Sequence, residues 1–213
     1  MIPREYQLFG TAECLRIGAA LNERENAEFG PDFTWSIESS EHWLHSGCMF
    51  YSAVICPASH RIVGLTSVML TGQTSAARLL LGEVKEQYLL PWFLESLTTN
   101  PILYFSSVLS EEGKFLPILY EKLLSDVESY LDVHQLTVTS GLTIALGPNG
   151  LQHLQANGFV PIADAAYLNK YEFMRIDATT AQTQFWRRLL RAAPATESHP
   201  PCHSAALTNT CTH

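Results

Sequence analysis

The sequence predicts an α/β (α+β) protein in which helices flank a mixed central sheet. Apolar alternation typical of strands, apolar spacing typical of helices, and the order of these patterns along the chain carry the prediction. Residues 101–159 are the clearest part, because they read as strand, glycine-bearing turn, long helix, second strand and short helix. We expect a ligand to bind where the first of these strands meets its helix.

The composition favours one globular domain with a tail. The 213 residues are 46% hydrophobic, which is enough for a sizeable core. The net charge of −8 argues against a nucleic-acid partner, which requires a basic face. No run approaches the ~18 apolar residues of a membrane span, and no basic leader with an apolar segment opens the chain. Cys14, Cys48 and Cys56 lie in apolar patterns that suit a reducing compartment, so we expect a cytoplasmic protein.

The N-terminal third is expected to contain a short strand within residues 1–10 and then a helix. Thr11 suits the N-cap of that helix, which ends near residues 29–31. A short capped helix is expected within residues 35–44.

The next part predicts a hairpin. Residues 48–56 and 62–70 alternate as strands do, and a turn separates them. Residues 71–100 are harder to interpret. They predict a helix packed on the core, and the alternative is that this apolar segment covers a pocket.

The central stretch begins with a buried strand at 102–108. Ser110 is a candidate cap for the following helix, and Pro117 suits its first turn because a proline there loses no helical hydrogen bond. The face that packs on the sheet is predicted to consist of Leu116, Leu119, Leu123, Val127 and Tyr130. Further elements are expected as a strand at 135–140, a short helix at 151–157 and a final strand at 166–176.

The chain changes character after Asp177. Residues 1–177 are expected to form the domain, 178–193 a basic amphipathic helix, and 194–213 a disordered tail. The tail carries His199, Cys202, His203, Cys211 and His213, whose spacing fits no established zinc pattern. We therefore expect no metal site.

Three short phrases, together with the order of the elements, carry a resemblance. They are Arg61-Ile-Val-Gly64, Ser107-Val108 followed by a glycine-bearing turn, and Asn157-Gly158-Phe159-Val160. The chain resembles the GNAT (Gcn5-related) N-acetyltransferase superfamily over residues 10–176. The resemblance implies a GNAT-like acyl-CoA N-acyltransferase fold. It also implies that acetyl-CoA or another acyl-CoA binds along the strand before the main helix, with its pyrophosphate on the amides of the next turn. The implied donor-binding residues are Ser106, Ser107, Val108, Leu109, Gly113, Lys114, Phe115, Leu116 and Asn149.

The turn departs from the pattern of that family, (Q/R)xxGx(G/A). It reads Glu112-Gly-Lys-Phe-Leu-Pro117, so a carboxylate stands where Gln or Arg is expected, and Pro117 has no amide to donate. Gly113 and Lys114 compensate in part, since a lysine meets phosphate as a point charge.

Catalytic candidates are fewer. The family's Tyr position, four residues before the Gly-Phe pair, is Leu154, and the neighbouring His153 is the candidate acid for the departing thiolate. Ser140 is a polar candidate near the acyl centre. The general base is open among Glu83, Glu86 and Glu23, and each of these residues also fits a plain surface position.

Two functions remain open. In the first, a small-molecule or peptide amine attacks the thioester directly in a ternary complex, and the strand around Ser106–Val108 orients the thioester. Relatives such as acyl-homoserine lactone synthases and long-chain N-acyl amino acid synthases lack the glycine-rich loop and use acyl carrier protein. Arg187, Arg188 and Arg191 are candidates to dock such an acidic carrier. In the second, the chain is a catalytically inactive binding or regulatory protein of the same fold.

Overall fold

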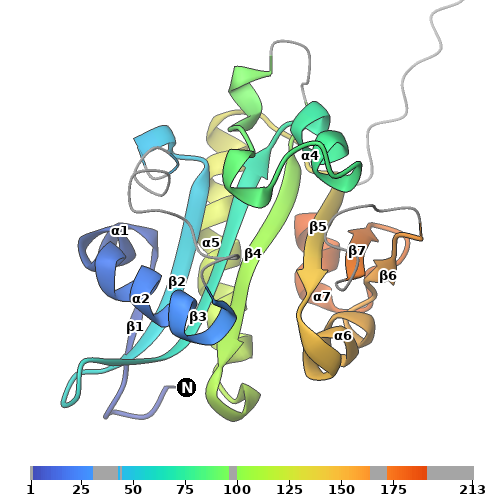
Figure 1. Cartoon of the computed structure of the whole chain (residues 1–213). Coiled ribbons are helices and arrows are strands. Elements are labelled where there is room, and N and C mark those ends of the chain that lie inside the picture. Colours follow the sequence, from blue (N-terminus) through green and yellow to red (C-terminus); the bar gives the residue numbers. More distant parts are fainter. Residues whose placement is uncertain (1, 31–42, 44, 96–99, 164–171, 191–213) are drawn as a thin grey trace, which may run out of the picture.

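A computed structural model describes residues 2–30, 43, 45–95, 100–163 and 172–190, and every structural statement below concerns these residues. They include one seven-stranded mixed sheet of order β1-β2-β3-β4-β5-β7-β6, with helices on both faces (Figure 1). The strands are β1 Gln7–Phe9, β2 Met49–Cys56, β3 Arg61–Thr71, β4 Ile102–Ser110, β5 Ser140–Ala145, β6 Val160–Pro161 and β7 Glu172–Asp177. The helices are α1 Thr11–Cys14, α2 Gly18–Phe29, α4 Gln73–Leu80, α5 Leu116–Val133, α6 Gly147–Ala156 and α7 Gln184–Leu189. Short 3-10 turns are η1 Leu15–Ile17, η3 Glu86–Tyr88, η4 Trp92–Leu94 and η5 Glu111–Gly113.

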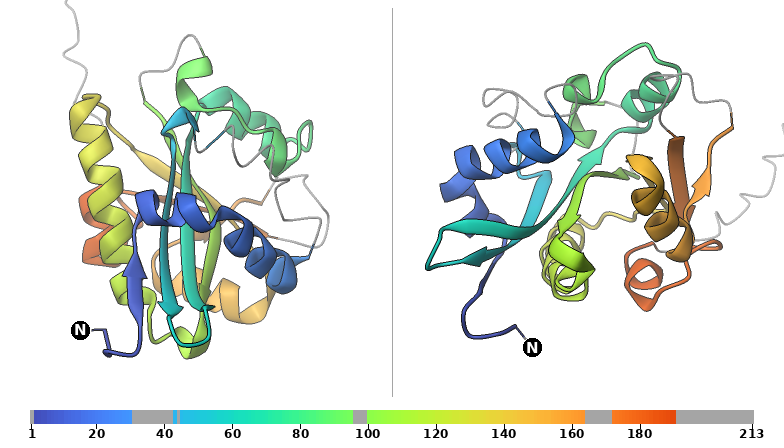
Figure 2. Two further views of the ribbon diagram at one scale, coloured as in Figure 1. Left: turned by 90° about the vertical axis from the view of Figure 1, so that its left-hand side faces the viewer. Right: turned by 60° about the horizontal axis from the view of Figure 1, so that its bottom comes forward.

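The helices divide between the two faces of the sheet. In the right-hand view of Figure 2, α2 and α4 lie above the sheet, whereas α5 and α7 lie below it. On the lower face, the hydroxyl of Ser52 in β2 donates to the Leu119 carbonyl of α5 at 2.7 Å. Trp186 of α7 is buried there against Phe105 of β4, with ring centroids 4.6 Å apart. We call the lower face the α5 face and the upper face the α2 face.

Strand β4 carries a bulge that separates it from β5. In the antiparallel pairing with β3, Ser67 lies opposite Ser107 and Val68 opposite Phe105, so Ser106 is an extra residue in β4. Strand β5 pairs with β4 in parallel over Leu103–Phe105. Beyond that point the two strands diverge toward the bottom of Figure 1. Among the residues that the structure describes, the second half of β4 therefore has a strand partner on the β3 side alone.

Several predicted elements are confirmed. The hairpin of β2 and β3, the strand before the main helix and the helix packed on the core after residue 71 are all present. Pro117 lies in the first turn of α5, as predicted. The prediction that Ser110 caps the main helix is wrong, because Phe115 is the N-cap of α5; Ser110 ends β4, and its hydroxyl oxygen accepts the amide of Phe115 at 3.1 Å.

The strand predicted at residues 135–140 is wrong, since β5 begins at Ser140. Helix α5 ends in a Schellman motif: Gln135 has a positive φ of 53°, and the Leu136 amide donates to the Leu131 carbonyl at 2.8 Å. Gln135 and Leu136, which were predicted to begin the strand, therefore terminate the helix instead. The strand forms later, where Gly141 lies opposite Leu103.

Thr11 is not the N-cap of the first helix. Gly10 occupies that position, and its amide donates to the Glu13 carboxylate at 3.0 Å. The Thr11 hydroxyl instead accepts the Tyr51 amide at 3.1 Å and bonds to the Asp126 carboxylate at 3.0 Å. Tertiary contacts thus replace the local cap.

The last elements differ in their bounds. Helix α6 already begins at Gly147, because Pro148 suits a first helical turn. The final strand is β7, and the earlier part of the predicted 166–176 strand lies outside the described residues, as does most of the helix predicted at 35–44.

Candidate functional site

A cavity of about 740 Å³ lies where β4 and β5 diverge. Helix α2 contributes one wall, and η5, the start of α5 and α6 contribute the rest. The structure brings together in this cavity many of the residues predicted from the sequence: Ser106, Val108, Leu109, Gly113, Leu116, Asn149 and His153. We call this the first cavity.

The edge of β4 that faces the first cavity offers main-chain hydrogen-bonding groups. Residues 107–110 pair with β3 on one side but have no strand partner on the other side among the described residues. An extended ligand with amide groups can bind such an edge as an added strand does. The pantetheine arm of a thioester donor has this chemistry.

Two amides of the turn after β4 are bonded within the protein, and a third residue of the turn has none. Gly113 has a positive φ of 71°, which permits the tight turn. The Lys114 amide donates to the Glu111 carbonyl at 3.3 Å, and the Phe115 amide donates to the Ser110 hydroxyl. Pro117 has no amide hydrogen. Lys114, Phe115 and Pro117 therefore have no amide available to bind a pyrophosphate.

The side chains of Lys114 and Phe115, both predicted to bind the donor, lie away from the first cavity. Phe115 is buried in a small cluster with Val54 and Val63, and its ring meets Tyr6 edge to face at 5.0 Å. The Lys114 ammonium lies 5.5 Å from the Tyr6 ring centroid and 4.9 Å from that of Phe115. Aromatic packing against the N-terminal residues explains both positions.

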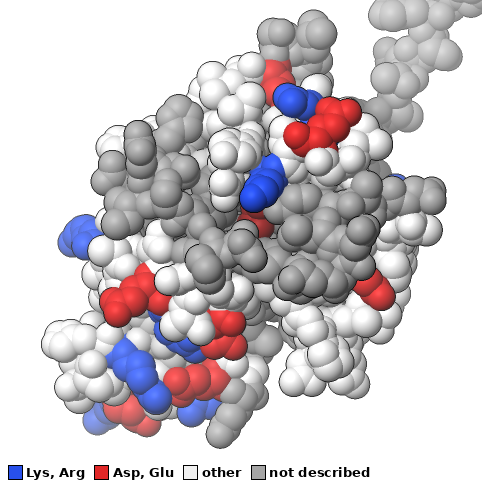
Figure 3. Space-filling model, in the orientation of Figure 1, with Lys and Arg blue, Asp and Glu red and all other residues white. Residues whose placement is uncertain are grey.

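The charged side chains that line the first cavity are Arg24, Glu28 and Glu111. Arg24 donates to Glu28 at 3.0 Å and to the Ile62 carbonyl at 3.4 Å. Basic and acidic side chains lie intermixed at the lower left of Figure 3. Arg24 is therefore the cation at this cavity, a role that the sequence did not indicate because the Arg24–Glu28 spacing is that of an ordinary surface pair.

His153 and Tyr120 form a pair where α6 meets α5. The Nε2 atom of His153 lies 2.9 Å from the Tyr120 hydroxyl, and the two rings are stacked. Burial lowers the pKa of His153 and raises the pKa of Tyr120. Both groups are thus neutral near pH 7 and share a hydrogen bond through which a proton can move.

A buried carboxyl lies at the bulge on the α2 face. Glu25 of α2 is 7% exposed, and its carboxyl accepts a hydrogen bond from the Ser107 hydroxyl. Next to it, the hydroxyls of Ser67 and Ser106 lie 2.6 Å apart. Burial raises the pKa of Glu25 to about 7, and the bond from Ser107 opposes that rise. A carboxyl that titrates near neutral pH is suited to general-base chemistry.

From the sequence, Glu25 is expected on the solvated face of a helix, with a position lining a substrate groove as the alternative for Glu23 and Glu25, and it is not among the candidate bases. The candidate bases lie elsewhere. Glu83 is exposed and pairs with Arg78 at 3.3 Å, Glu23 is exposed, and Glu86 is buried in η3. Neither these three residues nor Glu25 lines the first cavity, but Glu25 is hydrogen-bonded to Ser107 of β4, the strand that borders it. Ser140 lines a second, separate cavity.

The arginines predicted to dock a carrier have partners of their own. Arg188 pairs with Glu128 at 2.7 Å, and Arg187 donates to the Ala181 carbonyl at 3.1 Å. Both are exposed on α7, whereas Arg191 lies outside the described residues. The histidines and cysteines of the tail also lie outside them. In the part of the chain that the structure describes, no helix combines the length and apolar character that a membrane crossing requires.

Comparisons with known proteins were made by sequence and by structure. No protein-family model matches the chain, and no curated protein matches it. The chain does resemble solved structures. FeeM, an N-acyl amino acid synthase from uncultured soil microbes, is 13% identical with a TM-score of 0.48, over 87% of this chain and 99% of FeeM. A ribosomal-protein-S5-alanine acetyltransferase from Vibrio fischeri is 10% identical with a TM-score of 0.43, over 86% of this chain and 98% of its own. A GNAT-family acetyltransferase from Staphylococcus aureus is 11% identical with a TM-score of 0.43, over 81% and 98%.

The topology itself corresponds to the fold that the sequence resemblance implies. The four-strand antiparallel half, the long crossover helix α5 and the parallel β4–β5 pair that separates after a bulge all occur in that order. The chain therefore has the GNAT-type mixed α/β fold.

Proposed function

We propose that the protein is an N-acyltransferase that moves an acyl group from a pantetheine thioester to an amine by direct attack in a ternary complex. The observation that carries this proposal is the edge of β4 that borders the first cavity without a partner from β5; the buried carboxyl of Glu25 is hydrogen-bonded to Ser107 of the same strand. Open main-chain groups suit the donor, and a carboxyl that titrates near neutral pH suits the deprotonation of an amine.

In this proposal the pantetheine arm lies along residues 106–110 of β4. A main-chain amide of this edge donates to the carbonyl oxygen of the thioester as negative charge develops on it. The amine nitrogen attacks the carbonyl carbon, the carbon–sulfur bond breaks, and an amide forms. The carboxylate of Glu25 receives the proton that the nitrogen loses. The His153–Tyr120 pair supplies a proton to the departing thiolate.

The site offers few protein groups to bind the phosphates of the donor. The Lys114 and Phe115 amides are bonded and Pro117 has none, and Arg24 is the cation among the described lining residues that can meet a phosphate. We infer that affinity for the donor depends on the pantetheine arm and the acyl chain more than on a pyrophosphate cradle. Both acyl-CoA and an acylated carrier protein satisfy that requirement.

Donor binding tests the proposal. Melting temperatures of the full chain are measured with acetyl-CoA, a long-chain acyl-CoA and an acyl carrier protein, because a ligand of the native state raises the melting temperature. We expect at least one thioester to stabilise the protein. Failure of all three to do so would contradict the proposal.

A blocking variant ties any stabilisation to the first cavity. Gly150 lines this cavity, and a Cβ placed there meets no atom within 4 Å, so Gly150→Leu fills space at little cost to folding. Gly18→Leu is the matched control, because Gly18 is equally unobstructed but does not line the cavity. We expect Gly150→Leu to abolish the rise in melting temperature that the donor causes and Gly18→Leu to retain it.

Carrier dependence has a separate test. Replacing Arg187, Arg188 and Arg191 together by Glu reverses the charge of the candidate docking surface. We expect activity with the carrier-bound donor to fall and activity with free acyl-CoA to persist. An equal response of both donors would exclude a specific role in carrier docking.

The committed amides of the turn favour a second candidate, a binding or regulatory protein of the same fold without catalysis. It predicts donor-dependent stabilisation without turnover of any amine. Single-turnover assays with radiolabelled donor separate the two candidates, because acyl transfer to any amine would exclude a protein without catalytic activity.

A further inference from the structure

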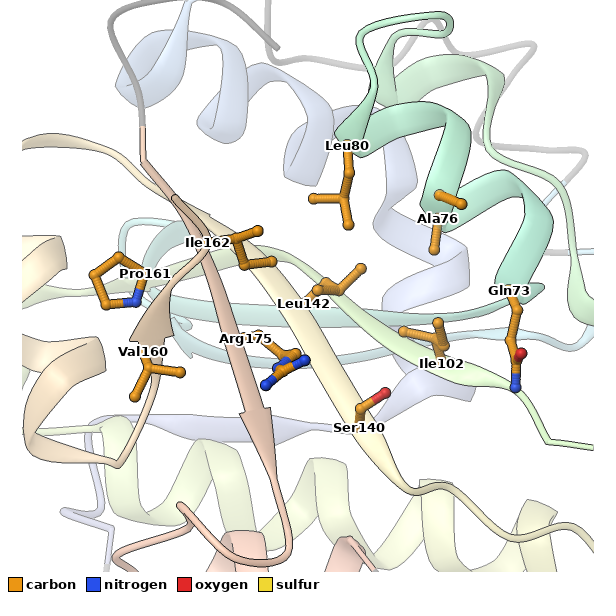
Figure 4. A pocket seen from close by; sticks show the side chains of 11 residues that line it. Gln73, Ala76, Leu80, Ile102, Ser140, Leu142, Val160, Pro161, Ile162 and Arg175 are labelled. Carbon is orange, nitrogen blue, oxygen red and sulfur yellow. The ribbon is translucent and has the colours of Figure 1, made fainter. Parts of the chain in front are cut away.

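A second cavity, of about 560 Å³, lies on the α2 face between helix α4 and the strands β5, β6 and β7 (Figure 4). Ala76 and Leu80 project from α4 toward the sheet, and Leu142 and Ile162 face them from the other side. This volume is within the range typical of small-molecule sites, which are largely apolar with a few polar groups that orient the ligand.

Arg175 supplies the charge in this cavity. It is the sole charged residue among the described residues that line it. Arg175 lies opposite Leu142 in the β5–β7 pairing, so both side chains share the face that α4 covers. A positively charged group set in apolar walls selects a ligand with one anionic group and an apolar body.

The guanidinium of Arg175 forms only a long ion pair with the described part of the protein. Its nearest carboxylate partner is Asp177 at 3.9 Å, and the side chain remains 55% exposed. Asp177 is itself committed, because it accepts the amides of Thr179 and Thr180 at 2.9 and 3.1 Å. The five donors of a guanidinium match the two oxygens of a carboxylate, so Arg175 can hold one in a bidentate pair.

The two cavities are adjacent along β5. Leu142 lines the second cavity and Ile144 lines the first. Residues two apart in a strand lie on the same face, about 7 Å from each other. Glu25 and Ser107 also lie on the α2 face. A ligand in the second cavity is therefore next to the point where the first cavity opens between the strands.

We propose that the second cavity binds an apolar monocarboxylate, with its carboxylate on Arg175 and its apolar body against α4 and Leu142. The binding site itself does not depend on acyl transfer. If the function proposed above holds, the carboxylate belongs to the amine that accepts the acyl group, since the position beside the first cavity suits the acceptor. The acceptor is then an apolar compound that carries both an amine and a carboxylate.

Three probes that share a phenylethyl body test the site by titration calorimetry on the full chain. L-phenylalanine carries an amine and a carboxylate, 3-phenylpropionate the carboxylate alone, and 2-phenylethylamine the amine alone. We expect the two carboxylates to bind at least tenfold more tightly than the amine. Acyl transfer to L-phenylalanine, but not binding, then distinguishes an acceptor from a bound acid.

Two variants assign that binding to the second cavity. Arg175→Gln is expected to weaken the binding of both carboxylate probes at least tenfold and to leave the affinity for 2-phenylethylamine unchanged. Arg78→Gln is the control, because Arg78 is an exposed arginine of α4 that does not line the cavity. Ala77→Trp is expected to block all three probes; Ala77 lines the cavity and is exposed, so the melting temperature should persist.

Equal binding of the three probes, or an unchanged affinity in Arg175→Gln, overturns the carboxylate site whatever the donor experiments show. Carboxylate binding that depends on Arg175, together with an absence of any donor effect, supports the site and refutes the acyltransferase. Acyl transfer to 2-phenylethylamine as efficient as to L-phenylalanine overturns the assignment of the carboxylate to the acceptor.

Discussion

The two halves of β4 have the same local conformation but different surroundings. Over Leu103–Phe105 the strand is hydrogen-bonded to β3 on one side and to β5 on the other, and these side chains are buried. Over residues 107–110 its sole strand partner among the described residues is β3, and most of these side chains line the first cavity. A single extra residue, Ser106, separates the halves. The difference shows how one bulge divides a strand into a part that stabilises the fold and a part that is open to a ligand.

The largest expected effect comes from the first half. Phe105 is 2% exposed and packs against Phe159 and Trp186, so Phe105→Ala should lower the free energy of unfolding by about 3–5 kcal/mol. Val108→Ala in the second half should cost about 1 kcal/mol, because this side chain is only partly buried. Denaturant unfolding measures both. Equal losses would refute the division of β4 into two parts.

The next effect concerns Glu25, which contacts the second half at Ser107. If the carboxylate is the base, Glu25→Gln should reduce turnover about 100-fold and remove the ionisation near pH 7 from the rate profile. Glu23→Gln, an exposed neighbour on the same helix, is the control. A profile that keeps its limb near pH 7 in Glu25→Gln would exclude Glu25 as the base.

Glu25 also predicts a pH dependence of stability. Its folded pKa is raised from 4.5 to about 7, so the folded state binds more protons than the unfolded state between these values. Stability should therefore fall as the pH rises from about 4.5 to 7, by about 3 kcal/mol at most. Glu25→Gln should lack that decline. Unfolding of both proteins at pH 5 and pH 8 measures it, and parallel behaviour would contradict the buried carboxyl.

A smaller effect is expected at His153, across the first cavity. His153→Ala should reduce turnover at least tenfold if the pair with Tyr120 protonates the thiolate. A thioester whose leaving thiol is more acidic should restore part of the rate, because it needs less protonation. An unchanged rate would remove His153 from the mechanism. His60→Asn at the hairpin tip serves as the control.

The smallest effect is expected at Arg24. Arg24→Gln should weaken binding of acyl-CoA by about three- to tenfold, since an ion pair with a partly solvated side chain contributes about 1 kcal/mol. The loss should diminish at high salt, because screening weakens exposed charges. Equal weakening of a phosphate-free pantetheine thioester would show that Arg24 does not contact phosphate.

Patterns of single residues explain why part of the site was predictable. The apolar run before a glycine-bearing turn located β4 and the turn, so Ser106, Val108, Gly113 and Leu116 could be selected from sequence. The missing amide of Pro117 also follows from residue chemistry alone. The committed amide of Phe115 does not, because it depends on where the Ser110 hydroxyl lies.

Glu25 and the second cavity required the folded chain. In the sequence, Glu25 is one of several carboxylates on a polar helix face, and only the contact with Ser107, 82 positions away, buries it. Arg175, Leu142 and Ala76 come from three elements that are far apart in the chain. No local pattern records that they enclose one space.

The sequence by itself determined the hairpin, the long helix and the chemistry of the turn, because these depend on periodicity, proline and glycine within a few residues. The tertiary structure decided where β5 begins, which carboxyl is buried and which side chains share a cavity. The physical reason is range. Helix and strand patterns arise from neighbouring residues, whereas burial, pKa and cavity walls arise from contacts between elements that the chain brings together only on folding.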